Sequence, residues 1–276
     1  MKQNILVATD FSQRSFDVIQ KASEFANTHN FELHVVHILE KSFFNIVKDK
    51  NTIEKNFFGH LKEKLPFLQE HQFHCKEGDL EEEIENYVKK LNIFMIIIGS
   101  SGERSFISKQ FLGSSIKSIV RAVDVPCLVL KNTTNIVDFS TIMLPTDLSE
   151  KSKIYIHKIH TLFPNSKIEL LYSYVVPFEG RLNFYGLSKD ETVHFQDNIH
   201  QMALDEAYDF YQKLTIDRKK VKISLIKEGL NPEAFVAKSD DLGCNLIALH
   251  TTGHFSFFAF DLLEHANKDI LITKID

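Results

Sequence analysis

The sequence predicts an α/β fold made of two tandem units, each with a parallel sheet covered by helices on both faces. Two observations lead to this prediction. Short apolar segments alternate with segments of helical periodicity along the 276 residues, as they do in proteins with parallel sheets. The chain also repeats itself, and its length fits two domains of ordinary size.

Three pairs of similar segments carry the repeat. ILVATDFS at 5–12 returns as IMLPTDLS at 142–149, KEGDLEEEI at 76–84 as KEGLNPEAF at 227–235, and IIIGSSG at 96–102 as IALHTTG at 247–253. The members of the second and third pairs are separated by the same distance along the chain, and the members of the first pair by a shorter one. This difference indicates an insertion in the middle of the second copy. The predicted domains are residues 1–133 and 140–276.

In the first copy, the pattern predicts strands separated by helices. The expected strands are NILVAT, ELHVVHI, QFHCK, IFMIIIG and CLVLK. The first helix follows Ser12, a suitable N-cap, and the last begins near Gly113. The helices between them are a long region that includes Phe57, Phe58 and Leu61, and the acidic segment LEEEIENYVKKL. Runs as apolar as IFMIII fit strands that are buried on both faces.

Composition narrows the class of protein. The chain has 32 Lys and Arg against 37 Asp and Glu, a net charge of -5, so a binder of nucleic acid is not expected. The amino terminus lacks the apolar core of a secretory signal, and the longest apolar runs are too short to span a membrane. Cys75, Cys127 and Cys244 form no CxxC pair, which is typical of inert thiols in a reducing compartment. We therefore expect a cytoplasmic protein.

Polar and small residues follow two of the expected strands at the same rim of the sheet. Asp10 follows the first strand, and Gly99 ends IFMIIIG. Ligands of parallel sheets bind at this rim. An aspartate there can accept a hydrogen bond from a base or a ribose, while Gly99, Gly102, Gly113 and Ser114 can approach phosphates. The alternative is that Asp10 only caps the next helix and the glycines only permit positive φ angles.

ILVATDFS, PCLVLK and the G-x2-G…G-S spacing between them resemble the universal stress protein family, and the resemblance extends over both halves, the second as a diverged copy. It implies a five-stranded parallel sheet of the Rossmann-like, adenine nucleotide alpha hydrolase-like type. It also implies that the two units pack as a pseudo-dimer through their last strands. Many members bind ATP or a related adenine nucleotide through a G-x2-G-x9-G-[ST] motif.

Carried onto this chain, the resemblance assigns nucleotide-binding residues. It places Asp10 and Val35 at the base and ribose, Ala8 where the family often has proline, and Gly99, Gly102, Gly113, Ser114 and Ser115 around the phosphates. The chain departs from the motif in one respect, because ten residues instead of nine separate Gly102 from Gly113. Ser101 also stands where the family often has histidine.

The second copy departs further from this pattern. Asp147 keeps the carboxylate after the first strand, but His250 replaces the first glycine, and a ten-residue step from Gly253 arrives at Glu264. A carboxylate at the helix end where phosphates should sit would repel them. The final helix is expected to be mostly missing, and the second site to be degenerate. For the phenylalanine-rich segment 253–265 we expect core packing or docking of the two halves.

No catalytic or metal-binding residue is predicted. His157 and His160 have helical i, i+3 spacing, but no third ligand is identifiable. The chain has neither a Walker A lysine nor a G-x-S-x-G motif. The function expected is that of a stress-response regulatory protein that binds ATP or a related adenine nucleotide, with or without magnesium. A nucleotide-independent interaction or scaffold protein and a slow ATPase stay open, as do a protein partner and a homodimer.

Overall fold

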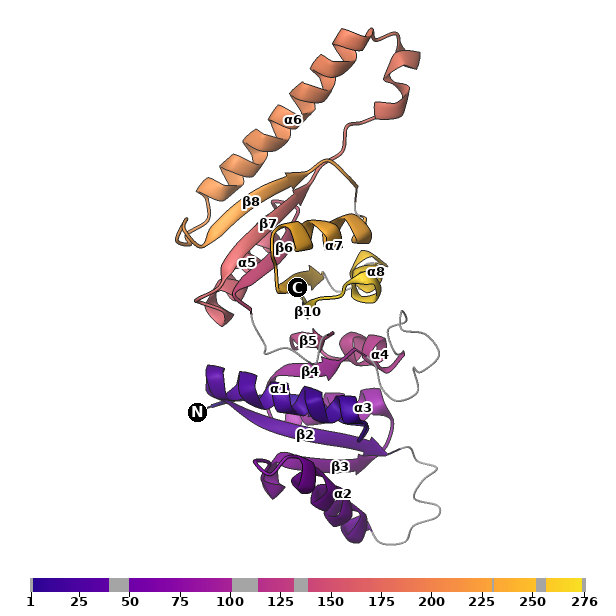
Figure 1. Ribbon diagram of the computed structural model, residues 1–276, viewed down its shortest axis with the longest axis vertical. Coiled ribbons are helices and arrows are strands. Elements are labelled where there is room, and N and C mark those ends of the chain that lie inside the picture. Colours follow the sequence, from indigo (N-terminus) through magenta and orange to yellow (C-terminus); the bar gives the residue numbers. More distant parts are fainter. Residues whose placement is uncertain are drawn as a thin grey trace. The chain divides into compact units, whose positions relative to one another are not determined.

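The computed structural model describes residues 2–39, 50–100, 114–131, 139–229, 231–251 and 257–274, and Figure 1 shows its elements. The chain forms two compact units. Unit 1 contains residues 1–138 together with residues 251–274, and unit 2 contains residues 139–250. The end of the second sequence copy therefore lies in the same compact unit as the first copy.

The elements alternate as the sequence predicts. The first copy contains β1 (Gln3–Ala8), α1 (Gln13–His29), β2 (Phe31–Leu39), α2 (Lys50–Lys64), the 3-10 helix η1 (Glu70–Gln72), β3 (Phe73–Glu77), α3 (Leu80–Lys90), β4 (Ile93–Gly99), α4 (Ser114–Ala122) and β5 (Cys127–Leu130). The second contains β6 (Thr141–Thr146), α5 (Glu150–Leu162), β7 (Lys167–Ser173), η3 (Glu179–Tyr185), α6 (Lys189–Gln212), β8 (Val221–Ile226), α7 (Pro232–Asp241), β9 (Leu246–Thr251), α8 (Phe257–His265) and β10 (Asp269–Lys274).

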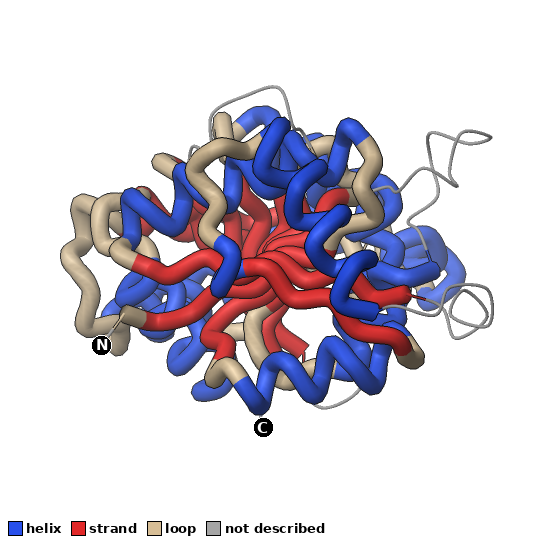
Figure 2. Tube along the Cα trace, turned by 90° about the horizontal axis from the view of Figure 1, so that it is seen from below, coloured by secondary structure: helices blue, strands red, loops and turns tan. Residues whose placement is uncertain are grey.

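The predicted α/β class is confirmed. In unit 1 the strand order is β3-β2-β1-β4-β5-β10, and the first five strands run parallel. The order reverses between β1 and β4, the kind of position where parallel sheets bind ligands beyond their carboxyl ends. Right-handed crossovers place α1 and α2 over one face and α3 and α4 over the other. In Figure 2 the strands run between helices on both sides.

The apolar strands form the core of unit 1. Ile5, Leu6 and Val7 on β1 and Ile96 and Ile97 on β4 have no exposed surface, because neighbouring strands flank them and helices cover both faces. Because this burial fixes the middle strands, it also fixes the positions of their carboxyl ends at Ala8 and Gly99.

In unit 2 the strand order is β9-β6-β7-β8, and all neighbours are parallel. The connection from β7 to β8, residues 174–220, is longer than the corresponding connection in the first copy, residues 40–72. This difference confirms the predicted insertion. It lies in the segment that forms η3 and α6, a helix of 24 residues where α2 has 15.

The last strands of the two copies pair with each other within unit 1. β10 runs antiparallel to β5, with Leu271 opposite Leu128, Ile270 opposite Val129 and Ile272 opposite Cys127. In the sequence repeat, Leu271 corresponds to Leu128, Ile270 to Cys127 and Ile272 to Val129. If each residue is replaced by its counterpart in the other strand, the same set of pairs results. The pairing therefore has a local two-fold symmetry centred on the two leucines. This is the arrangement expected of a pseudo-dimer that pairs through its last strands.

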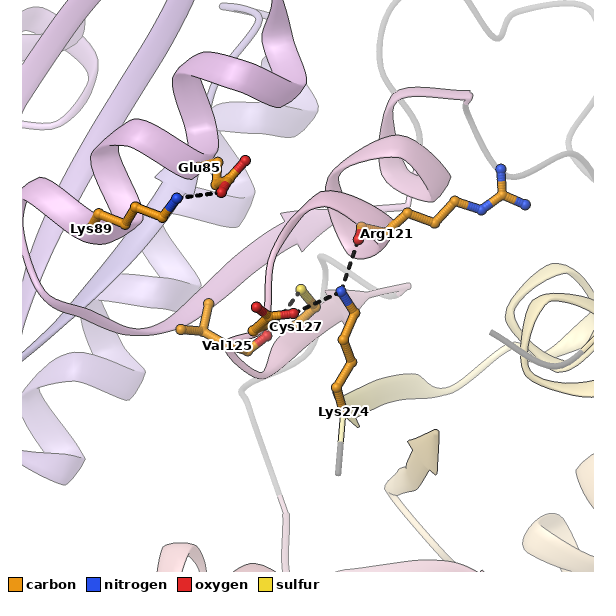
Figure 3. A network of polar contacts seen from close by, with 7 residues as sticks. Glu85, Lys89, Arg121, Val125, Cys127 and Lys274 are labelled. Atoms are coloured by element: carbon orange, nitrogen blue, oxygen red, sulfur yellow. Dashed lines mark hydrogen bonds and ion pairs between the residues drawn. The ribbon is translucent and has the colours of Figure 1, made fainter. Parts of the chain in front are cut away.

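A lysine at the carboxyl end of each strand, Lys131 directly after β5 and Lys274 as the last residue of β10, reinforces the pairing. Lys131 Nζ donates a hydrogen bond to the carbonyl oxygen of Leu263 in the last turn of α8. Lys274 Nζ donates to the carbonyl oxygen of Arg121 in the last turn of α4, at 2.8 Å, and contacts Asp124 at 3.0 Å (Figure 3). Each ammonium group satisfies a carbonyl that the helix itself leaves unpaired. No helix in the described part of the chain is both long and apolar enough to cross a membrane.

Candidate functional site

The turn after β1 is built from its own side chains. Thr9 Oγ1 accepts a hydrogen bond from the backbone N–H of Phe11 at 3.1 Å. Asp10 Oδ1 accepts from the backbone N–H of Ser12 at 3.0 Å and from its hydroxyl at 2.6 Å. Ser12 caps α1 by accepting from the backbone N–H of Ser15, as predicted. These bonds hold the Asp10 carboxylate at the carboxyl end of β1 and support the alternative that Asp10 helps to form the cap.

The same turn follows β6 in the second copy. Leu148 N–H donates to Thr146 Oγ1, Ser149 N–H donates to Asp147 Oδ1, and Ser149 caps α5 through Ser152 N–H. Phe11 and Leu148 share a left-handed backbone conformation, with φ of 61° and 60°. In addition, Ser152 Oγ donates to Asp147 Oδ1 at 2.5 Å. Burial would raise the pKa of Asp147, but the hydrogen bonds from Ser149 and Ser152 and the nearby His250 lower it.

Aromatic rings gather beside the first turn. The Phe11 ring stacks on Phe57 of α2, with centroids 4.8 Å apart, and meets the edge of His37 at 4.7 Å. His37 Nδ1 donates to the carbonyl oxygen of Thr9 at 2.7 Å, which defines its tautomer. Burial lowers the pKa of His37, although the hydrogen bond to Thr9 and the charge of Asp10 oppose this shift. His37 and the two half-buried phenylalanine rings therefore form an aromatic cluster next to Asp10.

Gly99 at the end of β4 lies directly against α1. A Cβ atom at this position would come within 2.8 Å of Val18 Cγ2. In the second copy the corresponding residues are His250 and Tyr155, whose rings lie with centroids 5.1 Å apart. The first copy therefore has no side chain where the second carries an imidazole.

Sequence reasoning missed two cations at the ends of β4 and β5. Arg14, in the first turn of α1, donates from Nη2 to Ser100 Oγ at 2.5 Å and to the carbonyl oxygen of Lys131 at 2.9 Å. Burial, followed by the charge of Arg14, lowers the pKa of Lys131 to about 8, against the attraction of Glu264 and Asp269. The only sign of Arg14 in the sequence was a charged residue four positions after Asp10. Without the structure, such a residue cannot be told from an ordinary charged residue on the exposed face of a helix.

The remaining predicted nucleotide-binding residues have different surroundings. Ala8 ends β1 opposite Val36. Val35 lies inside β2 with no exposed surface, so only its backbone could meet a ligand. Ser114 and Ser115 are the first residues of α4. Gly102 and Gly113 lie outside the described residues.

The expectation for the end of the second copy was wrong. α8 is a complete helix of nine residues, as long as α4. Glu264 lies near its carboxyl end, where it pairs with Lys117 of α4. The error arose because the shortened segment is the connection before the helix. The matched segments 96–102 and 247–253 precede α4 and α8. The first residues of these helices, Ser114 and Phe257, are closer together in the sequence than the two segments are, so the connection before α8 is the shorter one.

The phenylalanine-rich segment packs within unit 1. Ala259, Leu262 and Leu263 of α8 are buried, and Phe260 is 8% exposed. Lys117 and Arg121 of α4 lie over the Phe260 ring, at 5.7 and 4.7 Å from its centroid. This packing agrees with the predicted role in joining the halves of the sequence.

Cysteine and histidine chemistry is sparse among the described residues. The three cysteines are thiols, and Cys127 and Cys244 are buried. Burial raises the pKa of Cys127 to about 12. No group of three or more metal-binding side chains occurs in the described part of the chain. His157 contacts Thr215 at 3.4 Å, and His160 Nδ1 is buried without a hydrogen-bond partner.

Comparison with known proteins agrees with this architecture. Residues 1–131 match the model of the universal stress protein family. The chain is 32% identical over 132 residues to universal stress protein A homolog 1 of Coxiella burnetii, and the matched region covers 43% of this chain and 88% of that protein. It is 23% identical over 144 residues to universal stress protein G of Escherichia coli O157:H7, and the matched region covers 48% of this chain and all of that protein.

Two solved structures share the fold over almost the whole chain. A functionally unknown protein from Pseudomonas aeruginosa PAO1 superposes with a TM-score of 0.66 at 12% identity, covering 100% of this chain and 93% of that one. A universal stress protein from Archaeoglobus fulgidus DSM 4304 superposes with a TM-score of 0.62 at 14% identity, covering 98% and 96%.

Proposed function

Because the chain belongs to the universal stress protein family, we propose that it is a stress-response regulatory protein whose first copy binds ATP or a related adenine nucleotide. The site lies beyond the carboxyl ends of β1 and β4. The observation that carries the proposal is that two features occur at the ends of neighbouring strands. The carboxylate of Asp10 is held in place after β1, and Gly99 leaves the end of β4 without a side chain. A base and ribose would lie beside Asp10, and the phosphates would pass over Gly99 toward the start of α4.

The second copy supports this proposal by contrast. It keeps the turn around Asp147 but places the His250 ring at the position of Gly99. An imidazole there takes up space that the phosphates would need. We therefore propose one nucleotide site per chain, with magnesium arriving on the nucleotide phosphates.

The test is to denature the purified protein and to assay the released supernatant for nucleotide by chromatography. A Gly113→Asp variant places a carboxylate directly before α4 and should lose the nucleotide, because negative charge at a helix amino terminus repels phosphate. Ser256→Asp, directly before α8, is the matched control and should retain it. Adenine nucleotide at about one equivalent per chain, lost only in Gly113→Asp, is the expected result.

A second candidate function is that of a nucleotide-independent interaction protein. The observation that favours it is a group of exposed aromatic residues in η3 and just before it. Phe178, Phe184 and Tyr185 are 65%, 90% and 63% exposed. If the wild-type protein carries no nucleotide and millimolar ATP with magnesium does not raise its melting temperature, this second function replaces the first.

A further inference from the structure

We propose that Arg14, supported by the adjacent Lys131, forms a subsite for the second and third phosphates of the nucleotide, so that the first copy prefers ADP and ATP over AMP and adenosine. This inference rests on the proposed function and deepens it. It concerns residues that neither the motif of the family nor the sequence pattern assigned.

The position of the two cations fits such a subsite. Arg14 reaches from α1 across the carboxyl end of β4 to that of β5, where it contacts Ser100 and the carbonyl oxygen of Lys131. β4 lies between β1 and β5 in the sheet. Strands are about 4.8 Å apart, so the end of β5 lies roughly 10 Å from the end of β1. A nucleoside beside Asp10 would bring only the outer phosphates to this place.

The hydrogen-bonding state of Arg14 leaves capacity for an anion. Its two hydrogen bonds in the described part of the chain go to neutral oxygens and come from the same nitrogen, Nη2. Nε is buried and has no hydrogen-bond partner. A guanidinium has five N–H donors arranged to meet carboxylate or phosphate oxygens. No carboxylate in the described ranges forms an ion pair with Arg14, so its charge is available to phosphate.

Lys131 strengthens the positive field without needing to touch the ligand. Its ammonium group caps α8 through the carbonyl oxygen of Leu263, and its backbone accepts the hydrogen bond from Arg14. The proximity of the two cations is reflected in the pKa of Lys131, which burial and Arg14 lower to about 8. An anion bound between them would relieve this repulsion, because a nearby negative charge stabilises both cations.

A purely structural role, tying the end of β4 to that of β5, would account for the two Nη2 contacts alone. It predicts that loss of Arg14 weakens the binding of every adenine compound equally. A phosphate subsite predicts a loss that depends on the number of phosphates. The two roles therefore give different results in one set of measurements.

The experiment measures the affinities of adenosine, AMP, ADP and ATP by titration calorimetry, for the wild type and for Arg14→Gln. The matched control is Lys151→Gln, at the position of the second copy that corresponds to Arg14 and exposed on α5. We expect Arg14→Gln to lose roughly tenfold to a hundredfold in affinity for ADP and ATP, as for one charge-assisted hydrogen bond. Its affinities for adenosine and AMP should stay within about twofold, and Lys151→Gln should match the wild type.

Arg14→Lys serves as the second variant. It retains the charge but not the forked donors, so it should lose less affinity for ATP than Arg14→Gln, and it decides the question if Arg14→Gln does not fold. Equal losses for all four compounds, or none, would overturn the subsite. Wild-type protein that binds adenosine and ATP equally well would overturn it while leaving the proposed function intact. Wild-type protein that binds none of the four would instead overturn the proposed function.

Discussion

At the scale of single residues, the two copies show how one position can keep or lose a site. Gly99 and Val18 in the first copy correspond to His250 and Tyr155 in the second, and each pair is in contact. The exchange is coupled, because a side chain at residue 99 would collide with Val18 where it stands. The glycine is therefore required both by local packing and by the open strand end that the proposed nucleotide uses.

A partly buried histidine pair is expected to make stability depend on pH. His34 Nδ1 and His74 Nε2 lie 3.1 Å apart across β2 and β3. Burial lowers the pKa of His74 to about 4, with smaller contributions from the charges of His34, Lys90 and His71. The unfolded chain, with a histidine pKa near 6.5, therefore binds more protons than the folded chain between these values. We therefore expect the contribution of His74 to the free energy of unfolding to fall as the pH drops from about 6.5 to about 4.

His74→Gln should flatten this dependence, because its side-chain amide can still pair with His34 but does not take up a proton. The slope of unfolding free energy against pH should fall by up to about 1.4 kcal/mol per pH unit, the value for one proton. Urea unfolding at several pH values measures it. His194→Gln, at an exposed position on α6, is the control and should keep the wild-type slope. An unchanged slope in His74→Gln would show that the pair does not control acid stability.

At the scale of elements, the repeated turn allows the two helix caps to be compared. Ser12 and Ser149 each cap a helix by accepting a hydrogen bond from the residue three positions on. The Ser12 hydroxyl also donates to Asp10, whereas in the second copy Ser152 supplies the hydroxyl that donates to Asp147. Ser12 therefore combines two roles that the second copy divides between two serines.

Ser12→Ala should lower the free energy of unfolding more than Ser149→Ala does. We expect about 1 kcal/mol for the lost cap in each variant and about 1 kcal/mol more for the bond to Asp10 in Ser12→Ala. Ser152→Ala should show the second effect in the second copy. Denaturation of the three variants in parallel measures the differences, and equal losses for Ser12→Ala and Ser149→Ala would contradict the comparison.

The sequence predicted most of these elements, but it did not predict the contacts around the proposed site. Apolar runs and the Ser12 cap placed strands and helices correctly, because burial and capping act over a few residues. Extending the repeat beyond its last matched segment failed at Glu264, since a shortened connection before α8 leaves no local signal. Arg14 was missed for a different reason. Its partners at Ser100 and Lys131 are distant in sequence, and only the sheet order brings them together.

At the scale of the whole molecule, the chain closes the edge of its first sheet with its own last strand. β5 would be an edge strand with unpaired backbone groups if β10 were absent, and such edges readily pair with another chain. The β5–β10 register is symmetric about Leu128 and Leu271. A second β5 could therefore take the place of β10 with the same register. When two copies are joined in one chain, the contact between their last strands forms within the chain. The linkage raises the effective concentration of each strand for the other and so favours the contact.

This symmetry predicts the behaviour of a truncated chain. Residues 1–138 alone, which lack α8 and β10, should form a homodimer through antiparallel pairing of β5 with β5. Residues 1–138 joined by a flexible linker to residues 251–274 contain the complete compact unit and should not dimerise through β5, because β10 already occupies that edge. Size-exclusion chromatography with light scattering gives both masses. A folded fragment 1–138 that is monomeric, or equal association of the two fragments, would show that β5 does not direct pairing. A dimer formed only by the shorter fragment would show that the interface between the two copies is encoded in a strand of four residues and the helix that packs beside it.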